Sequence, residues 1–222
     1  MRAVRTFFKY LHEKQRIFLN PADGLIVGTP DRMLQRVPTE DEVRKLLSQP
    51  DTAKPEGIRN RAILEVAYSA GLRRNELAAM RLEDVSPDVT SLRVHGKGGK
   101  ERVVPLGRRA GIWLRKYLKE VRPVLLSGND TDALWLKRPG RPLGDEGIAM
   151  MARHCTASAG IKPPLTLHSL RRACATHMLQ NGAHPIQIQM LLGHASMYHL
   201  SQYLKLTIAE LKDAHSKSNP GQ

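Results

Sequence analysis

The sequence predicts a mainly α-helical protein that also contains a small antiparallel β-sheet. Through most of the 222 residues, apolar side chains recur at helical spacing between residues that start and stop helices. Near residue 89 this pattern gives way to two short segments rich in strand-forming residues, separated by glycines. Hydrophobic residues make up 41% of the chain, which is enough to bury a core.

The N-terminal segment predicts one helix over residues 3–19, ended by Asn20-Pro21. Its apolar residues fall broadly on one face: Val4, Phe7, Phe8, Leu11 and Phe18. The Pro, Gly and Asp residues that follow, up to residue 37, are typical of a linker. We therefore expect a helix within residues 1–22 and a linker over residues 23–37.

Three helices are predicted next. Thr39 begins the first, because Glu42 three residues later completes a capping box. The second covers residues 58–70 and ends at Gly71. A short third helix covers Arg73–Met80.

The β-rich segments predict a hairpin. Ser91–His95 and Lys100–Val104 would form its strands, and Gly96-Lys97-Gly98-Gly99 would form its loop. Helices then return over about 108–120, 145–158 and 167–180, and another runs from Pro185 to Gly193. A last amphipathic segment covers about 207–215. We expect one domain over residues 38–215 and a disordered tail over residues 216–222.

The charge balance favours a polyanionic partner. Lys and Arg total 35 against 21 Asp and Glu, which gives a net charge of +14 and a pI near 10.2. An ordinary basic surface, a ribosomal protein or a membrane-surface protein would have a similar balance. The two cysteines lack disulfide or zinc-knuckle spacing, and no apolar run is long enough to cross a membrane, so we expect a cytoplasmic protein.

Two clusters in the first half could bind phosphate, although each has a plainer explanation. Arg73 and Glu76 would share a helix face, so the arginine could grip a phosphate while the glutamate supports it, or the two could form a surface ion pair. Lys97 lies among glycines that permit close approach to DNA, or the segment is a solvated turn. The glycines do not form a Walker A loop, because no Ser or Thr follows Gly96-Lys97.

Three further clusters lie in the second half. His168 and Arg171 are three residues apart on one predicted helix face, where an anion could lie between them, or the face could simply be polar. His194 follows a predicted helix end and could complement the helix dipole there. Tyr203 is either a chemical group or an aromatic anchor of the core, and Tyr198 competes with it.

A zinc site is the main alternative for the histidines and cysteines. His168, Cys174 and His177 are close in sequence, but no set of four ligands with standard zinc spacing occurs. We therefore expect no metal and no cofactor.

Taken in order, these motifs resemble the tyrosine recombinase (phage integrase) family, and most of all its Xer-type members. The resemblance covers residues 38–210 and rests on five segments: Gly71-Leu72-Arg73 with Glu76-Leu77, Gly96-Lys97-Gly98 with Lys100-Glu101-Arg102, His168 to Arg171, Leu191-Leu192-Gly193-His194, and Tyr203 nine residues later. It implies the integrase-type catalytic fold, and site-specific DNA recombination through a 3′-phosphotyrosine intermediate without metal or ATP.

The resemblance also implies a role for each matching residue. Arg73 and Arg171 would clamp the scissile phosphate, and His194 would hydrogen-bond to it. Lys97 would protonate the leaving 5′-oxygen, His168 would assist as acid or base, Tyr203 would be the nucleophile, and Glu76 would support the site. Elementary chemistry agrees, because a tyrosine titrates near pH ~10 and needs nearby cations to react as phenolate at neutral pH.

The implied partners are double-stranded DNA and three further copies of the chain, in a homotetramer on paired sites associated with the nucleoid. Family members carry a complete core-binding domain before the catalytic one, whereas residues 1–22 resemble only its last helix. A truncated, catalytically silent DNA-binding protein is therefore the alternative function. A type IB topoisomerase would use similar chemistry, but the LLGH segment and its spacing to Tyr203 argue against it. An RNA-binding protein fits less well, because aromatic residues make up only 5% of the chain.

Overall fold

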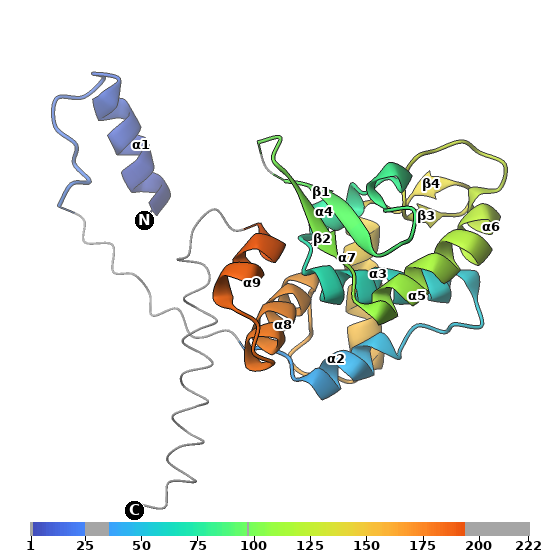
Figure 1. Ribbon diagram of the computed structural model, residues 1–222. Coiled ribbons are helices and arrows are strands. Elements are labelled where there is room, and N and C mark those ends of the chain that lie inside the picture. Colours follow the sequence, from blue (N-terminus) through green and yellow to red (C-terminus); the bar gives the residue numbers. More distant parts are fainter. Residues whose placement is uncertain (1, 25–35, 97, 194–222) are drawn as a thin grey trace, which may run out of the picture. The chain divides into compact units, whose positions relative to one another are not determined.

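The computed structural model describes residues 2–24, 36–96 and 98–193, whose helices and strands are labelled in Figure 1. The chain divides into two compact units, Met1–Gln35 and Arg36–Gln222. In the first unit, helix α1 spans Arg2–Glu13 and is shorter than the predicted 3–19. Gln15 adopts a left-handed φ of 53°, and the N–H groups of Gln15 and Arg16 donate to the carbonyls of His12 and Leu11. This backbone closure ends the helix without the glycine that usually marks such an end.

The second unit begins with helices α2 (Glu40–Leu47), α3 (Pro55–Ala70) and α4 (Arg74–Ala78), close to their predicted positions. The predicted capping box of Thr39 and Glu42 is present. Helix α3 is buried along nearly its whole length, so it forms the centre of the core. It packs against α2 and against three later helices, α5 (Arg108–Lys116), α7 (Gly144–Ser158) and α8 (Leu167–Gln180). It ends at Gly71, whose φ of 57° is left-handed.

The predicted hairpin consists of β1 (Ser91–His95) and β2 (Glu101–Pro105), which are antiparallel. Leu92 lies opposite Val104 and Val94 lies opposite Arg102. Because side chains alternate along a strand, these four residues share one face, and its three apolar members are buried. A second ribbon, β3 (Leu136–Lys137) with β4 (Arg141–Pro142), was not predicted, because two-residue strands carry no alternation.

Most of the remaining helices pack against α3. Helix α5 (Arg108–Lys116) continues through a π-helical turn (Tyr117–Val121) into α6 (Arg122–Leu126), beyond the predicted end near residue 120. Helices α7 (Gly144–Ser158), α8 (Leu167–Gln180) and α9 (Pro185–Leu192) agree with the sequence (Figure 1). The predicted segment 207–215 lies outside the described residues.

The mainly α fold with a small antiparallel sheet is therefore confirmed, while the predicted domain limits and tail stay predictions. Among the described helices, none combines the length and the apolar character that a bilayer crossing requires.

Candidate functional site: an arginine-lined pocket

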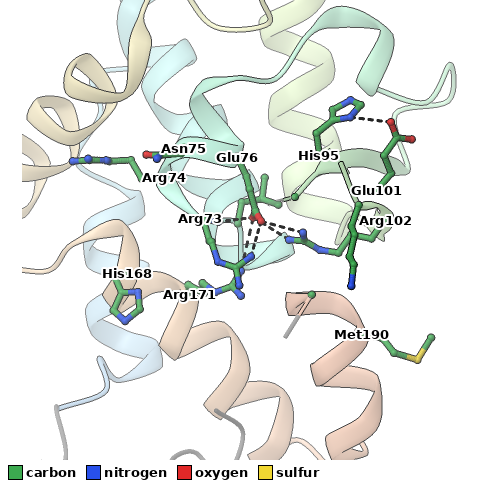
Figure 2. A pocket seen from close by; sticks show the side chains of 14 residues that line it. Arg73, Arg74, Asn75, Glu76, His95, Glu101, Arg102, His168, Arg171 and Met190 are labelled. Carbon is green, nitrogen blue, oxygen red and sulfur yellow. Dashed lines mark hydrogen bonds and ion pairs between the residues drawn. The ribbon is translucent and has the colours of Figure 1, made fainter. Parts of the chain in front are cut away.

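A pocket of about 1130 Å³ lies where the start of α4, the β1–β2 hairpin, the start of α8 and the end of α9 meet. Figure 2 shows the guanidinium groups of Arg73, Arg102 and Arg171 converging on the carboxylate of Glu76. Glu76 lies in α4, Arg102 in β2 and Arg171 in α8, and Arg73 is the N-cap residue of α4. The pocket therefore depends on the tertiary fold rather than on one local segment.

Arg73 is placed by the turn between α3 and α4. The left-handed Gly71 ends α3, and Arg73 then occupies the N-cap position of α4 with Glu76 in its first turn. The backbone N–H of Arg73 donates to Oε2 of Glu76 at 2.9 Å, and its Nη1 donates to Oε1 at 2.7 Å. Its side chain remains 46% exposed, so it faces the pocket while the buried carboxylate holds it from behind.

Glu76 is the only carboxylate in contact with all three arginines among the described residues. Burial alone would raise its pKa, but hydrogen bonds from Arg102 and from the backbone and side chain of Arg73 outweigh burial and lower the pKa to about 2. Three guanidinium charges against this one carboxylate leave a local charge of +2. The pocket is therefore suited to a doubly or singly charged anion such as a phosphate.

Arg171 is 3% exposed and joins two helix ends. Its Nη1 donates to the carbonyl of Gly71 at 2.5 Å, and its Nη2 donates to the carbonyl of Leu192 at 2.6 Å. The C-termini of α3 and α9 both carry partial negative charge, which a buried guanidinium offsets. This arrangement fixes the position of Arg171 in the wall of the pocket and holds the end of α9 against α3.

His168 lies one helical turn before Arg171, on the first turn of α8, which a capping box of Thr166 and Ser169 begins. Desolvation lowers the pKa of His168, and the positive charges of Arg172, Arg171 and Arg73 lower it further. The neutral imidazole is therefore favoured at pH 7, and such a group can accept a proton from a reacting hydroxyl.

The described part of the chain thus brings together four of the seven residues predicted from the sequence: Arg73, Glu76, His168 and Arg171 all line the pocket. Lys97, His194 and Tyr203, together with the competing Tyr198, lie outside the described residues. Their neighbours in sequence, Gly96 and Gly193, line the pocket.

Sequence reasoning missed Arg102, whose three side-chain nitrogens all bond in the pocket. In the sequence, Arg102 is only one of three charged residues in a row, Lys100-Glu101-Arg102. Strand alternation could have identified it, because Arg102 shares a strand face with the buried Val104. A second missed feature is His95, whose Nε2 bonds to Asp84 at 2.8 Å and whose Nδ1 pairs with Glu101 at 3.0 Å. The hydrogen bond to Asp84 raises the pKa of His95.

Two of the three residues that could have formed a zinc site, His177 and Cys174, have other partners. His177 bonds through Nδ1 to the Tyr68 hydroxyl at 2.8 Å and through Nε2 to the carbonyl of Pro38 at 2.9 Å. Cys174 is buried against Ser69 and Met178, and burial raises its thiol pKa to about 12. Within residues 2–24, 36–96 and 98–193, no three His, Cys, Asp or Glu side chains form a group that could hold a metal ion.

Comparison with known proteins matches residues 36–210 to the phage integrase family. Tyrosine recombinase XerC 2 of Ralstonia nicotianae is 38% identical over 221 residues, which are 99% of this chain and 63% of that protein. Tyrosine recombinase XerD of Pseudomonas putida is 36% identical over 217 residues, which are 98% of this chain and 73% of that protein. The chain thus spans less than two thirds of the length of the first of these relatives and nearly three quarters of the length of the second.

Solved structures give the same picture of the fold. The XerA recombinase superposes with a TM-score of 0.72 at 28% identity, over 84% of this chain and 66% of the other. The XerH site-specific recombinase bound to a palindromic difH substrate superposes with a TM-score of 0.78 over 94% of this chain and 63% of the other. Identity to XerH is only 22%, so that similarity supports the fold alone.

Proposed function

The chain belongs to the phage integrase family, and from this membership we propose that it cleaves and rejoins DNA at specific sites through a 3′-phosphotyrosine intermediate. The observation that carries the proposal is the convergence of Arg73 and Arg171 on one pocket with His168 at its edge. Two cations and a neutral imidazole are what a phosphodiester needs when negative charge builds on its oxygens during attack.

In the proposed reaction, the Tyr203 oxygen attacks the phosphorus and the bond from phosphorus to the 5′-oxygen breaks. Lys97 gives its proton to that leaving oxygen, and His168 accepts the proton of the tyrosine hydroxyl. Arg73, Arg171 and His194 bind the non-bridging oxygens. Rejoining runs the same steps in reverse, and the energy of the diester is kept in the phosphotyrosine bond, so no ATP is consumed.

The partners in this proposal are double-stranded DNA and further copies of the chain. Strand exchange between two duplexes requires four cleavages, so we propose a homotetramer with one tyrosine for each strand. The net charge of +14 supports binding to the DNA backbone. Such a protein would work in the cytoplasm on chromosomal or mobile-element DNA.

The test is covalent capture on nicked duplexes with randomised sequence. A nick just beyond the cleaved bond lets a short fragment diffuse away, so the protein–DNA adduct accumulates and survives denaturation. We expect an adduct with the wild-type chain and with Tyr198→Phe, and none with Tyr203→Phe. A 5′-end label should stay with the protein and a 3′-end label should be lost, because the tyrosine holds the 3′-phosphate.

Each other outcome contradicts part of the proposal. An adduct that persists in Tyr203→Phe would refute the nucleophile, and retention of the 3′-end label would refute the polarity. Binding to duplex DNA with no adduct on any sequence would instead support the catalytically silent DNA-binding protein.

A further inference from the structure

Arg102 occupies an unusual position for a strand residue, because its side chain reaches two other elements. It leaves the inner face of β2 beside Val104, and its side chain is only 15% exposed. Its Nη1 and Nη2 donate to Oε1 and Oε2 of Glu76 at 3.1 and 3.0 Å, a two-pronged contact with α4. Its Nε donates to the carbonyl of Leu191 in α9 at 2.9 Å.

The contact with Glu76 reaches Arg73 through the shared carboxylate. Oε1 of Glu76 accepts from Arg102 on one side and from Arg73 on the other, at 3.1 and 2.7 Å (Figure 2). A two-pronged guanidinium–carboxylate pair fixes the plane of the carboxylate as well as its distance. Arg102 of β2 therefore sets the orientation of the Glu76 carboxylate and, through that carboxylate, the orientation of the Arg73 guanidinium.

The contact with α9 involves the last residues before His194. A Cβ atom placed on Gly193 would lie 3.0 Å from both Cδ and Nη1 of Arg102, so the Arg102 side chain lies directly against the Gly193 backbone. Gly193 also has a left-handed φ of 62°. A residue with a Cβ would be strained there by its φ and by Arg102 together.

We infer that Arg102 is a positioning residue for strand cleavage: it holds the Glu76–Arg73 pair and the end of α9 in the arrangement that the reaction requires. The inference rests on the proposed function. Arg102 is assigned a positioning role because each of its three side-chain nitrogens bonds to Glu76 or to Leu191. Lysine cannot replace it, because one ammonium group cannot form the pair to Glu76 and the bond to Leu191 with the same geometry.

The experiment measures single-turnover adduct formation on the nicked duplex that the wild-type chain cleaves best. The variants are Arg102→Lys and Arg102→Met, with Arg93→Lys as the matched control. Arg93 is exposed on the opposite face of the same hairpin, where it lies across from Val103. Duplex affinity, from fluorescence anisotropy, and thermal unfolding are measured on every variant at the same salt concentration.

We expect Arg102→Lys to slow cleavage by about 10- to 100-fold at saturating protein, while the affinity for duplex DNA changes by less than about threefold. The reason is that a small misplacement of reacting groups lowers the rate of the chemical step much more than it lowers binding affinity. Arg93→Lys should cleave at the wild-type rate. In a double-mutant cycle with Glu76→Gln, the two losses should be strongly non-additive, because Arg102 acts through Glu76.

Cleavage by folded Arg102→Lys at the wild-type rate would overturn the inference, as would fully additive losses in the cycle. If Arg102→Met is unfolded at the assay temperature, the lysine variant and the cycle still decide. The absence of an adduct with the wild-type chain would overturn the proposed function, and the inference with it. The wild-type reaction therefore distinguishes failure of the proposed function from failure of the inference about Arg102.

Discussion

Replacement of Glu76 by glutamine is expected to reduce stability strongly and in a pH-dependent way. The carboxylate is buried, accepts hydrogen bonds from Arg73 and Arg102, and has a pKa of about 2 against an ordinary value of 4.5. This difference in pKa corresponds to about 3 kcal/mol of preference for the charged group in the folded state. Glu76→Gln should therefore lower the free energy of unfolding by about 3 kcal/mol at pH 7.

The pH dependence follows from the sign of the pKa change. Because the folded pKa lies below the unfolded one, the stabilisation is complete above pH 4.5 and is lost as the pH falls from 4.5 towards about 2. The difference between wild type and Glu76→Gln should thus be constant near neutrality and shrink in acid. Urea unfolding followed by the fluorescence of the two tryptophans, Trp113 and Trp135, gives both curves.

Glu83→Gln is the matched control, since Glu83 is an exposed residue in the turn after α4 and should change stability by less than about 0.5 kcal/mol. A Glu76→Gln effect as small as that of the control would refute the role of Glu76 as the shared acceptor of the arginines. A large effect that stays constant from pH 7 to about pH 3 would show that lost packing, rather than lost charge, is responsible.

Three further predictions concern other parts of the protein. The hydrogen bond that the His95 imidazole donates to Asp84 raises the pKa of His95. The stability advantage of wild type over His95→Gln should therefore be full below about pH 6.5 and decline as the pH rises through the folded pKa of His95; a difference in urea midpoint that does not change with pH would contradict this. Gly193→Ala should lower the free energy of unfolding by more than the roughly 1–2 kcal/mol expected from its left-handed φ, because the new Cβ also meets Arg102. Gly98→Ala should lose only what its own left-handed φ costs, because no atom of the described residues lies within 4 Å of the new Cβ; equal losses in thermal unfolding would refute the contact between Gly193 and Arg102. Affinity for duplex DNA, measured by anisotropy, should fall by roughly three orders of magnitude between about 50 and 200 mM salt, and a flat salt dependence would argue against binding through phosphates.

The helices and the hairpin were predictable because their ends carry local chemistry. Thr39 with Glu42, Gly71 and Gly193 mark helix limits through hydrogen bonds or a left-handed φ that few other residues supply. The end of α1 was misplaced because Gln15 takes the left-handed conformation in place of a glycine. A proline such as Pro123 normally ends a helix, so the sequence does not predict that α5 continues into α6. In the structure Pro123 lies in the first turn of α6, directly after the π-helical turn, where a proline is tolerated.

Four members of the candidate site were predictable from the sequence, but their bonding was not. Motif order and spacing identified Arg73, Glu76, His168 and Arg171, and the fold places all four at one pocket. No sequence pattern indicated that Arg171 would donate to two helix C-termini or that Arg102 would share Glu76 with Arg73. These bonds join residues 21 to 100 positions apart, so they follow from tertiary packing and not from local spacing.

Mapping the attachment point of DNA on the protein tests the central claim most directly. Trypsin should release residues 173–205 as one peptide, because no Lys or Arg lies between Arg172 and Lys205, and this peptide contains both Tyr198 and Tyr203. After nuclease trimming of the captured adduct, fragmentation in the mass spectrometer should place a 3′-linked phosphodeoxynucleotide on Tyr203. The same modification on Tyr198, on a serine, or on any other peptide would contradict the account.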